Sequence, residues 1–127
     1  MKEVMAIVRP AKVGATKEAL ADAGFPSFTC QVVLGRGKKL MSETIATAVL
    51  DEGEVPQNQL GEAISEATRL ISKRMFTLIV EDDDVPRVVK LLINTNQNKT
   101  PGDGKIFVLP ISDSYRVRNG ERAADAY

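Results

Sequence analysis

The residues best suited to hold a charged ligand form a short glycine-rich stretch, Gly102-Asp103-Gly104-Lys105, that leads into an apolar run. Glycines let backbone N–H groups approach an anion closely, and successive turn amides can surround one. The stretch is not a P-loop, because that motif, G-x-x-x-x-G-K-[ST], opens a helix, whereas this one enters a predicted strand. Alone it is more typical of an ordinary turn followed by a solvated lysine, and we expect Asp103 to serve that turn.

Two further basic elements could join this motif. In SYRVR, Arg116 and Arg118 alternate with apolar residues, so on an extended segment they project from one face. Arginine suits bidentate contact with phosphate. The second element, Gly35-Arg36-Gly37-Lys38-Lys39, follows a predicted strand. Three glycine and basic elements at strand ends could converge on a polyphosphate, and solvated strand edges are the alternative interpretation.

The composition excludes several classes of function. Lys plus Arg equals Asp plus Glu at 17 each, so the formal net charge is zero, which argues against nucleic-acid partners and stable membrane association. Histidine is absent, which removes Ser-His-Asp triads and His-ligated metals, and we expect no metal ligands in the chain. The single Cys30 lies in FTCQVV and is interpreted as a buried structural thiol. Neither a signal peptide nor a membrane span is apparent, so we expect a cytoplasmic protein.

These candidate ligands are positioned by a repeated strand–helix–strand pattern. Apolar runs predict strands at residues 4–8, 28–34, 75–80 and 105–110, the first of them buried on both faces. Helices are predicted from Lys12 to Ala23, closed by Gly24, and from the acidic residues 82–84 to about Asn94. The order βαββαβ predicts an α+β, ferredoxin-like domain spanning residues 1–127, with a four-stranded antiparallel sheet and both helices on one face.

A long insertion separates the second and third predicted strands. It covers about residues 36–73, far more than a hairpin needs, and long inserted loops are usually functional or disordered. Leu60, Ile64, Ala67 and Ile71 have helical spacing. Because apolar residues on a solvated loop would be costly, we interpret the insertion as a docking element. The C-terminal segment, about 111–127, ends in a polar tail that we expect to be frayed.

Alternative classes have weaker support. A small acylphosphatase-like enzyme needs a catalytic Arg–Asn pair, for which Arg9 with Asn94 or Asn96 are the candidates. An RNA-recognition module needs aromatic residues on its sheet, and the predicted strands lack a stacking set.

Four stretches carry a resemblance to a known family: MKEVMAIVRPAKVGATKEALADAGFPSFT, VLGRGK, PGDGKIFVLPI and YRVRNGE. In order and spacing the chain resembles the PII nitrogen-regulatory signal proteins over nearly its whole length. Its GFPSFT and GRGK stretches and its enlarged central loop look like the nitrogenase-associated PII-like branch, and within it the second type, which has the longer T-loop.

The resemblance implies a trimer with ATP or ADP bound in clefts between subunits. The implied phosphate ligands are Gly102, Gly104, Lys105, Arg116 and Arg118. At the base of the loop, the resemblance implies contacts from Gly35, Gly37 and Lys38. It places Thr29 in the adenine pocket, and Thr77 and Ile79 at positions that contact the adenine and ribose. The resemblance also implies 2-oxoglutarate held with Mg²⁺ at the base of the T-loop, with Lys73 gripping a carboxylate.

This sequence departs from the family in two places. Lys39 stands where the family usually has Gln, and an ammonium group cannot coordinate Mg²⁺. Metal-assisted binding in its usual form is therefore in question, and Lys39 is able instead to pair directly with a 2-oxoglutarate carboxylate. The T-loop contains no Tyr, so tyrosine uridylylation is not expected.

The function implied is that of a non-enzymatic nitrogen-status sensor. ATP and 2-oxoglutarate would bias the T-loop toward one conformation, and the loop would dock on the nitrogenase dinitrogenase component and inhibit it. Subunits would form a homotrimer or assemble with a paralogous PII-like subunit. The alternative is a conventional PII regulator of an ammonium channel or of another nitrogen-metabolism enzyme.

Overall fold

A computed structural model describes residues 1–37 and 69–126. Contacts divide the chain into two units, Met1–Val33 with Lys73–Tyr127, and Leu34–Ser72. Of the described elements, both helices and most of the sheet belong to the first unit. The expected T-loop at 36–73 and the helical spacing over 60–67 lie almost wholly outside the described residues, so the expectations for them stay untested.

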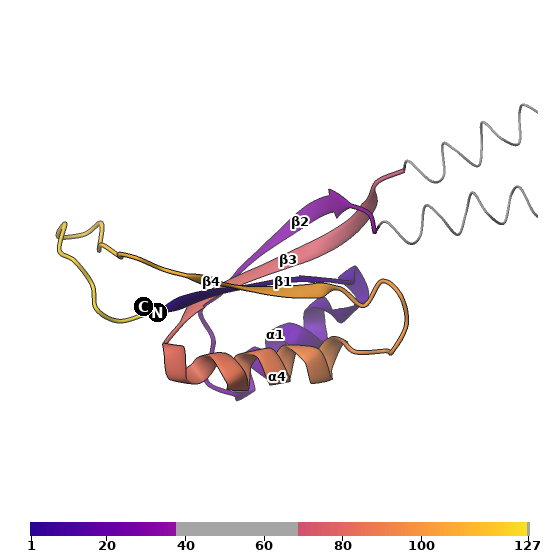
Figure 1. Ribbon diagram of the computed structural model, residues 1–127, viewed down its shortest axis with the longest axis horizontal. Coiled ribbons are helices and arrows are strands. Elements are labelled where there is room, and N and C mark those ends of the chain that lie inside the picture. The colour runs from indigo at the N-terminus through magenta and orange to yellow at the C-terminus, as the bar shows by residue number, and fades with distance from the viewer. Residues whose placement is uncertain (38–68, 127) are drawn as a thin grey trace, which may run out of the picture. The chain divides into compact units, whose positions relative to one another are not determined.

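The described elements follow the predicted order. Figure 1 shows α1 and α4 on the same side of a sheet whose strand order is β2-β3-β1-β4. The strands are β1 (Lys2–Val8), β2 (Thr29–Gly35), β3 (Ile71–Val80) and β4 (Lys105–Pro110), and the helices are α1 (Val13–Asp22) and α4 (Val85–Asn96), each preceded by a short 3-10 turn, Pro10–Lys12 and Asp82–Asp84. This confirms the ferredoxin-like α+β fold.

Period-two alternation on the central strands decides which face is covered. On β1, Val4, Ala6 and Val8 are buried, and on β3 Phe76, Leu78 and Val80 are buried. They pack with residues of both helices, among them Leu20 and Leu92, in one core. Burying a side chain of this size stabilises the fold by about 1.5–3 kcal/mol.

The other face of the sheet carries a different set of side chains. Because β1 pairs antiparallel with β3 and with β4, Met5 lies opposite Thr77 on one side and Phe107 on the other. These residues are half-buried or exposed. The prediction that residues 4–8 are buried on both faces is therefore wrong, since the helices cover only one face of the sheet.

The helix ends follow their sequence signals. Gly24 has φ +87°, and the N–H groups of Gly24 and Phe25 donate to the carbonyls of Ala21 and Leu20, at 3.1 and 2.8 Å. This pair of bonds is a Schellman motif, which needs a left-handed residue and so favours glycine. The glycine that was expected to close the first helix therefore does so.

Three further expectations need correction. Cys30 is exposed, because β2 is an edge strand of the sheet. Ile71, which had helical spacing, begins β3 instead. The C-terminal tail is not frayed: the N–H of Ala123 donates to the Ser114 carbonyl at 2.7 Å, and Ala123 is only 6% exposed. The buried alanine and the backbone hydrogen bond hold the tail in place, which its polar composition alone did not indicate.

No helix in the described parts of the chain is long and apolar enough to cross a membrane.

Candidate anion-binding site

The glycine motif forms the end of the loop between α4 and β4. Gly102 and Gly104 have φ values of +95° and +116°, which side-chain-bearing residues rarely adopt. A Cβ atom on Gly104 would lie 1.9 Å from the carbonyl oxygen of Ile7. Gly104 is therefore required for the loop to lie against β1, whether or not a ligand binds.

Asp103 holds the turn from inside. Its carboxylate accepts hydrogen bonds from the N–H groups of Asn98 at 2.8 Å and Thr100 at 3.3 Å, and from the Thr100 hydroxyl at 3.3 Å. Desolvation acts to raise the pKa of Asp103, but the backbone hydrogen bonds outweigh it and lower that pKa below its ordinary value. Asp103 serves the turn, as the sequence suggested.

Arg9, the last residue before the first 3-10 turn, clamps the same loop. Its Nη2 donates to the Pro101 carbonyl at 2.8 Å and to the Thr100 hydroxyl at 3.0 Å, and it lies 3.3 Å from the Asp103 carboxylate. Its Nε is buried and has no hydrogen-bond partner within the described residues. From the sequence, Arg9 was a candidate only for an acylphosphatase-like pair. The signal that could have identified it was a basic residue directly at the end of a central strand.

A second cation reaches this loop from β3. The ammonium of Lys73 donates to the Gly102 carbonyl at 2.9 Å. Partial burial and then the positive charge of Arg9 lower the pKa of Lys73, and the Asp103 carboxylate offsets them only in part. The structure thus brings together Lys73 and Gly102, which the resemblance assigned to different ligands.

The absence of a side chain at Gly102 lets these two cations approach its backbone closely. A Cβ there would lie 3.2 Å from Nη2 of Arg9 and 3.8 Å from Nζ of Lys73. Two positive groups therefore flank one backbone position, and Asp103 contributes the only carboxylate that is recorded against them in the described residues. A local excess of positive charge beside a glycine backbone is suited to an anion.

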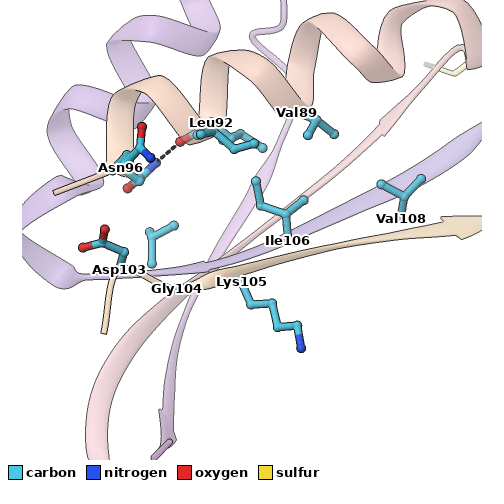
Figure 2. Close-up of a pocket in the computed structure, with 11 residues that line it drawn as sticks. Val89, Leu92, Asn96, Asp103, Gly104, Lys105, Ile106 and Val108 are labelled. Atoms are coloured by element: carbon cyan, nitrogen blue, oxygen red, sulfur yellow. Dashed lines mark hydrogen bonds between the residues drawn. The ribbon is translucent and has the colours of Figure 1, made fainter. Parts of the chain in front are cut away.

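Lys105 begins β4 and points away from α4. In Figure 2 its side chain extends to the opposite side of the strand from Ile106 and Val89. Its ammonium lies 5.5 Å from the centroid of the Phe107 ring, a cation–π contact on the helix-free face. On the helix side, β4 and α4 border an open pocket of about 460 Å³, which is lined mainly by apolar side chains such as Leu92, Ile106 and Val108 (Figure 2).

The two predicted arginines lie at the other end of β4. Lys105 pairs with Ile7, whereas Pro110 pairs with Lys2, so the strand separates its ends by about 17 Å. The C-terminal segment then runs beside the N-terminus (Figure 1), where the N–H of Ile111 donates to the Met1 carbonyl at 3.2 Å. The predicted convergence of Arg116 with the glycine motif does not occur within one chain.

The direction expected for the two arginines also needs correction. The chain turns at residues 117–119, and the N–H of Gly120 donates to the Arg116 carbonyl at 2.8 Å. Strand alternation, which was used to place Arg116 and Arg118 on one face, therefore stops before Arg118. Both side chains are exposed.

The remaining predicted site residues are spread over two strands. Thr29 is the exposed first residue of β2, and Thr77 and Ile79 lie half-buried on the helix-free face of β3. Gly35 and Gly37 have open space where a Cβ would lie. Lys38 and Lys39 are outside the described residues.

The candidate acylphosphatase pair is not assembled. The amide of Asn96 is buried and donates to the Thr16 hydroxyl at 3.2 Å and to the Leu92 carbonyl at 2.9 Å. Arg9 is bonded to the loop at 100–103. Asn94, the other candidate, is exposed on α4. Nothing in this geometry presents an Arg–Asn pair to a substrate.

Comparisons with known proteins bear on the whole chain. A family model described as Nitrogen regulatory protein P-II matches residues 1–121. The chain is 41% identical over 127 residues to the "Nitrogen fixation nifHD region GlnB-like protein 2" of Methanothermobacter marburgensis, covering 99% of each. It is 36% identical to a "GlnB-like protein 1" of the same kind of region in Methanothermococcus thermolithotrophicus, covering 95% of this chain and 97% of that protein.

A solved structure agrees. Arabidopsis thaliana PII bound to citrate is similar with a TM-score of 0.67 and 28% identity, over 97% of this chain and 85% of that one. The family model, the relatives and the fold all point the same way, and they confirm the resemblance seen in the sequence. The chain belongs to the P-II family of nitrogen regulatory proteins.

Proposed function

We propose that this chain is a non-enzymatic sensor that binds ATP or ADP, and 2-oxoglutarate, and that regulates nitrogenase through its T-loop. The family is one of signal proteins rather than enzymes, and two kinds of GlnB-like protein from nitrogen-fixation regions are among its relatives. The observation that carries the proposal is the charge around Gly102, where Arg9 and Lys73 lie close to a backbone position that has no side chain.

The separation of the two basic groups supports a shared site. Gly102, Gly104 and Lys105 lie at one end of β4, and Arg116 and Arg118 follow the other end. Within one chain they cannot contact a single polyphosphate. In a ring of identical subunits, however, one end of a chain can meet the opposite end of its neighbour. Family members form trimers, so we place the nucleotide between subunits.

The acid effector would bind beside the phosphates. Lys73 is a charged donor next to the loop carbonyl of Gly102, and a carboxylate that replaced this carbonyl as its acceptor would gain a charge-assisted hydrogen bond. Lys39 would supply a second contact. A ligand at this place shifts the T-loop only if its affinity differs between the two loop conformations. Mg²⁺ has no part in the proposal.

The T-loop is the proposed output. The purified chain, added to the nitrogenase dinitrogenase component, should inhibit substrate reduction, and 2-oxoglutarate with ATP should relieve the inhibition. A variant that lacks residues 40–70 should still bind ATP but should not inhibit. Full inhibition by this deletion variant would show that the loop does not dock. Steady release of phosphate from ATP would contradict a non-enzymatic role.

A further inference from the structure

Residues 114–123 form a C-terminal hairpin, and the chain that follows it brings a carboxylate to one of the proposed phosphate ligands. Nη2 of Arg116 lies 3.2 Å from Oδ1 and 3.0 Å from Oδ2 of Asp125. Both side chains are partly exposed, at 41% and 54%. Nη2 alone makes both contacts, so the pair engages one nitrogen of the guanidinium, and a phosphate that contacts Arg116 at two points would compete with Asp125 for it.

The backbone of the hairpin holds Asp125 in this place. Tyr115 pairs with Arg122 in an antiparallel bridge, and the N–H of Ala123 donates to the Ser114 carbonyl. Beyond Asp125, the N–H of Ala126 donates to the Glu81 carboxylate at 2.9 Å. Asp125 is therefore anchored on both sides, and a tethered group competes at a high effective concentration.

Arg118 provides the contrast. It lies in the turn two residues away and has no recorded hydrogen bond or ion pair within the described parts of the chain. The two arginines are thus in different states: one guanidinium is paired with an acid that follows its own hairpin, and the other is open to a ligand. Arg116 can offer Nη2 to a phosphate only after that nitrogen leaves Asp125.

We propose that Asp125 is an internal competitor for Arg116, and that it lowers nucleotide affinity by mimicking a phosphate group. The inference rests on the proposed function, because it takes Arg116 as a nucleotide ligand. Exchange of the Arg116–Asp125 pair for an Arg116–phosphate pair leaves the carboxylate to water, and the loss of that ion pair is subtracted from the binding free energy of the nucleotide.

The test compares three single variants by calorimetric titration with ATP and with ADP. Asp125→Asn removes the charge and nearly keeps the shape, and it should bind roughly two- to fivefold more tightly, the range expected for a partly exposed ion pair. Asp125→Glu keeps a carboxylate and should bind like the wild type. Asp113→Asn is the matched control: Asp113 pairs with Arg122 in the same hairpin, so it changes net charge equally without freeing Arg116.

Each outcome discriminates. Tighter binding by Asp125→Asn alone supports competition. An equal gain in Asp113→Asn would overturn it in favour of a general charge or hairpin effect. Unchanged or weaker nucleotide binding by Asp125→Asn would also overturn competition. Weaker binding would mean that Asp125 orients Arg116 for the ligand. If neither the wild type nor any variant binds nucleotide, the proposed function itself fails, and the competition with it.

Discussion

Substitution of Gly104 by alanine should strongly destabilise the protein. The residue has φ +116°, and a Cβ would lie 1.9 Å from the Ile7 carbonyl oxygen, 3.0 Å from the Ile7 carbonyl carbon and 3.4 Å from Cα of Val8. The left-handed backbone costs about 1–2 kcal/mol for a residue with a Cβ. The clash is with backbone, which cannot rotate away, and overpacking of this kind adds about 1–3 kcal/mol. We expect a loss of about 2–5 kcal/mol.

The assay is urea denaturation at one fixed protomer concentration, because assembly makes apparent stability depend on concentration. Two alanine substitutions serve as controls. Gly24→Ala has a positive φ of +87° but open space around it, and should cost only the backbone contribution of about 1–2 kcal/mol. Gly14→Ala lies in α1 with open space, and should be neutral or stabilise by up to about 1 kcal/mol. A Gly104→Ala protein as stable as Gly24→Ala would refute the close approach of this loop to β1.

Two further predictions concern the same loop. Gly102→Ala should lower the free energy of unfolding by about 1–2 kcal/mol. It should also weaken ATP binding at least about tenfold, because the new Cβ would lie between Arg9 and Lys73. An ATP affinity within a factor of two of the wild-type value would contradict the site. Asp103→Asn tests the lowered pKa of the Asp103 carboxyl. Because this pKa is lower in the folded state, the ionised carboxylate stabilises the fold at pH values above the ordinary pKa of 3.8. The stabilisation is lost as the pH falls through the folded-state pKa. The stability gap between wild type and Asp103→Asn should therefore be largest near neutral pH and shrink in acid, and a gap that is constant from pH 7 to pH 3 in denaturation curves would show that the carboxylate charge is not involved.

The elements that could be predicted were those with a strong local signal. The periodic Val and Leu residues of α4 and the Gly24 stop of α1 were read correctly, because amphipathic spacing and a left-handed cap are properties of neighbouring residues. The extent of β3 was underestimated. Among its first residues, Ser72, Lys73 and Arg74 are polar or basic. They form a strand because they pair with a neighbouring strand, and their composition does not indicate it.

Tertiary placement was the less predictable part of the site. Asp103 could be assigned to its turn from the sequence, since the Asp-Gly pattern is local. Arg9 could not, because its partners are about ninety residues away and only the central position of β1 brings them together. The pairing of Arg116 with Asp125 could not be predicted either. The polar composition of the C-terminal tail does not indicate that Ala123 is buried and that the tail returns to Arg116.

The central claim, a nucleotide site shared between the opposite ends of neighbouring subunits, can be tested by mixing two defective chains. Lys105→Ala and the double variant Arg116→Ala with Arg118→Ala should each fold and assemble but bind ATP poorly. When the two are unfolded together and reassembled in equal amounts, about one quarter of the clefts should combine two intact halves, and tight ATP binding should return at that fraction. Mixed assemblies that form and still bind no better than either parent would contradict a shared site.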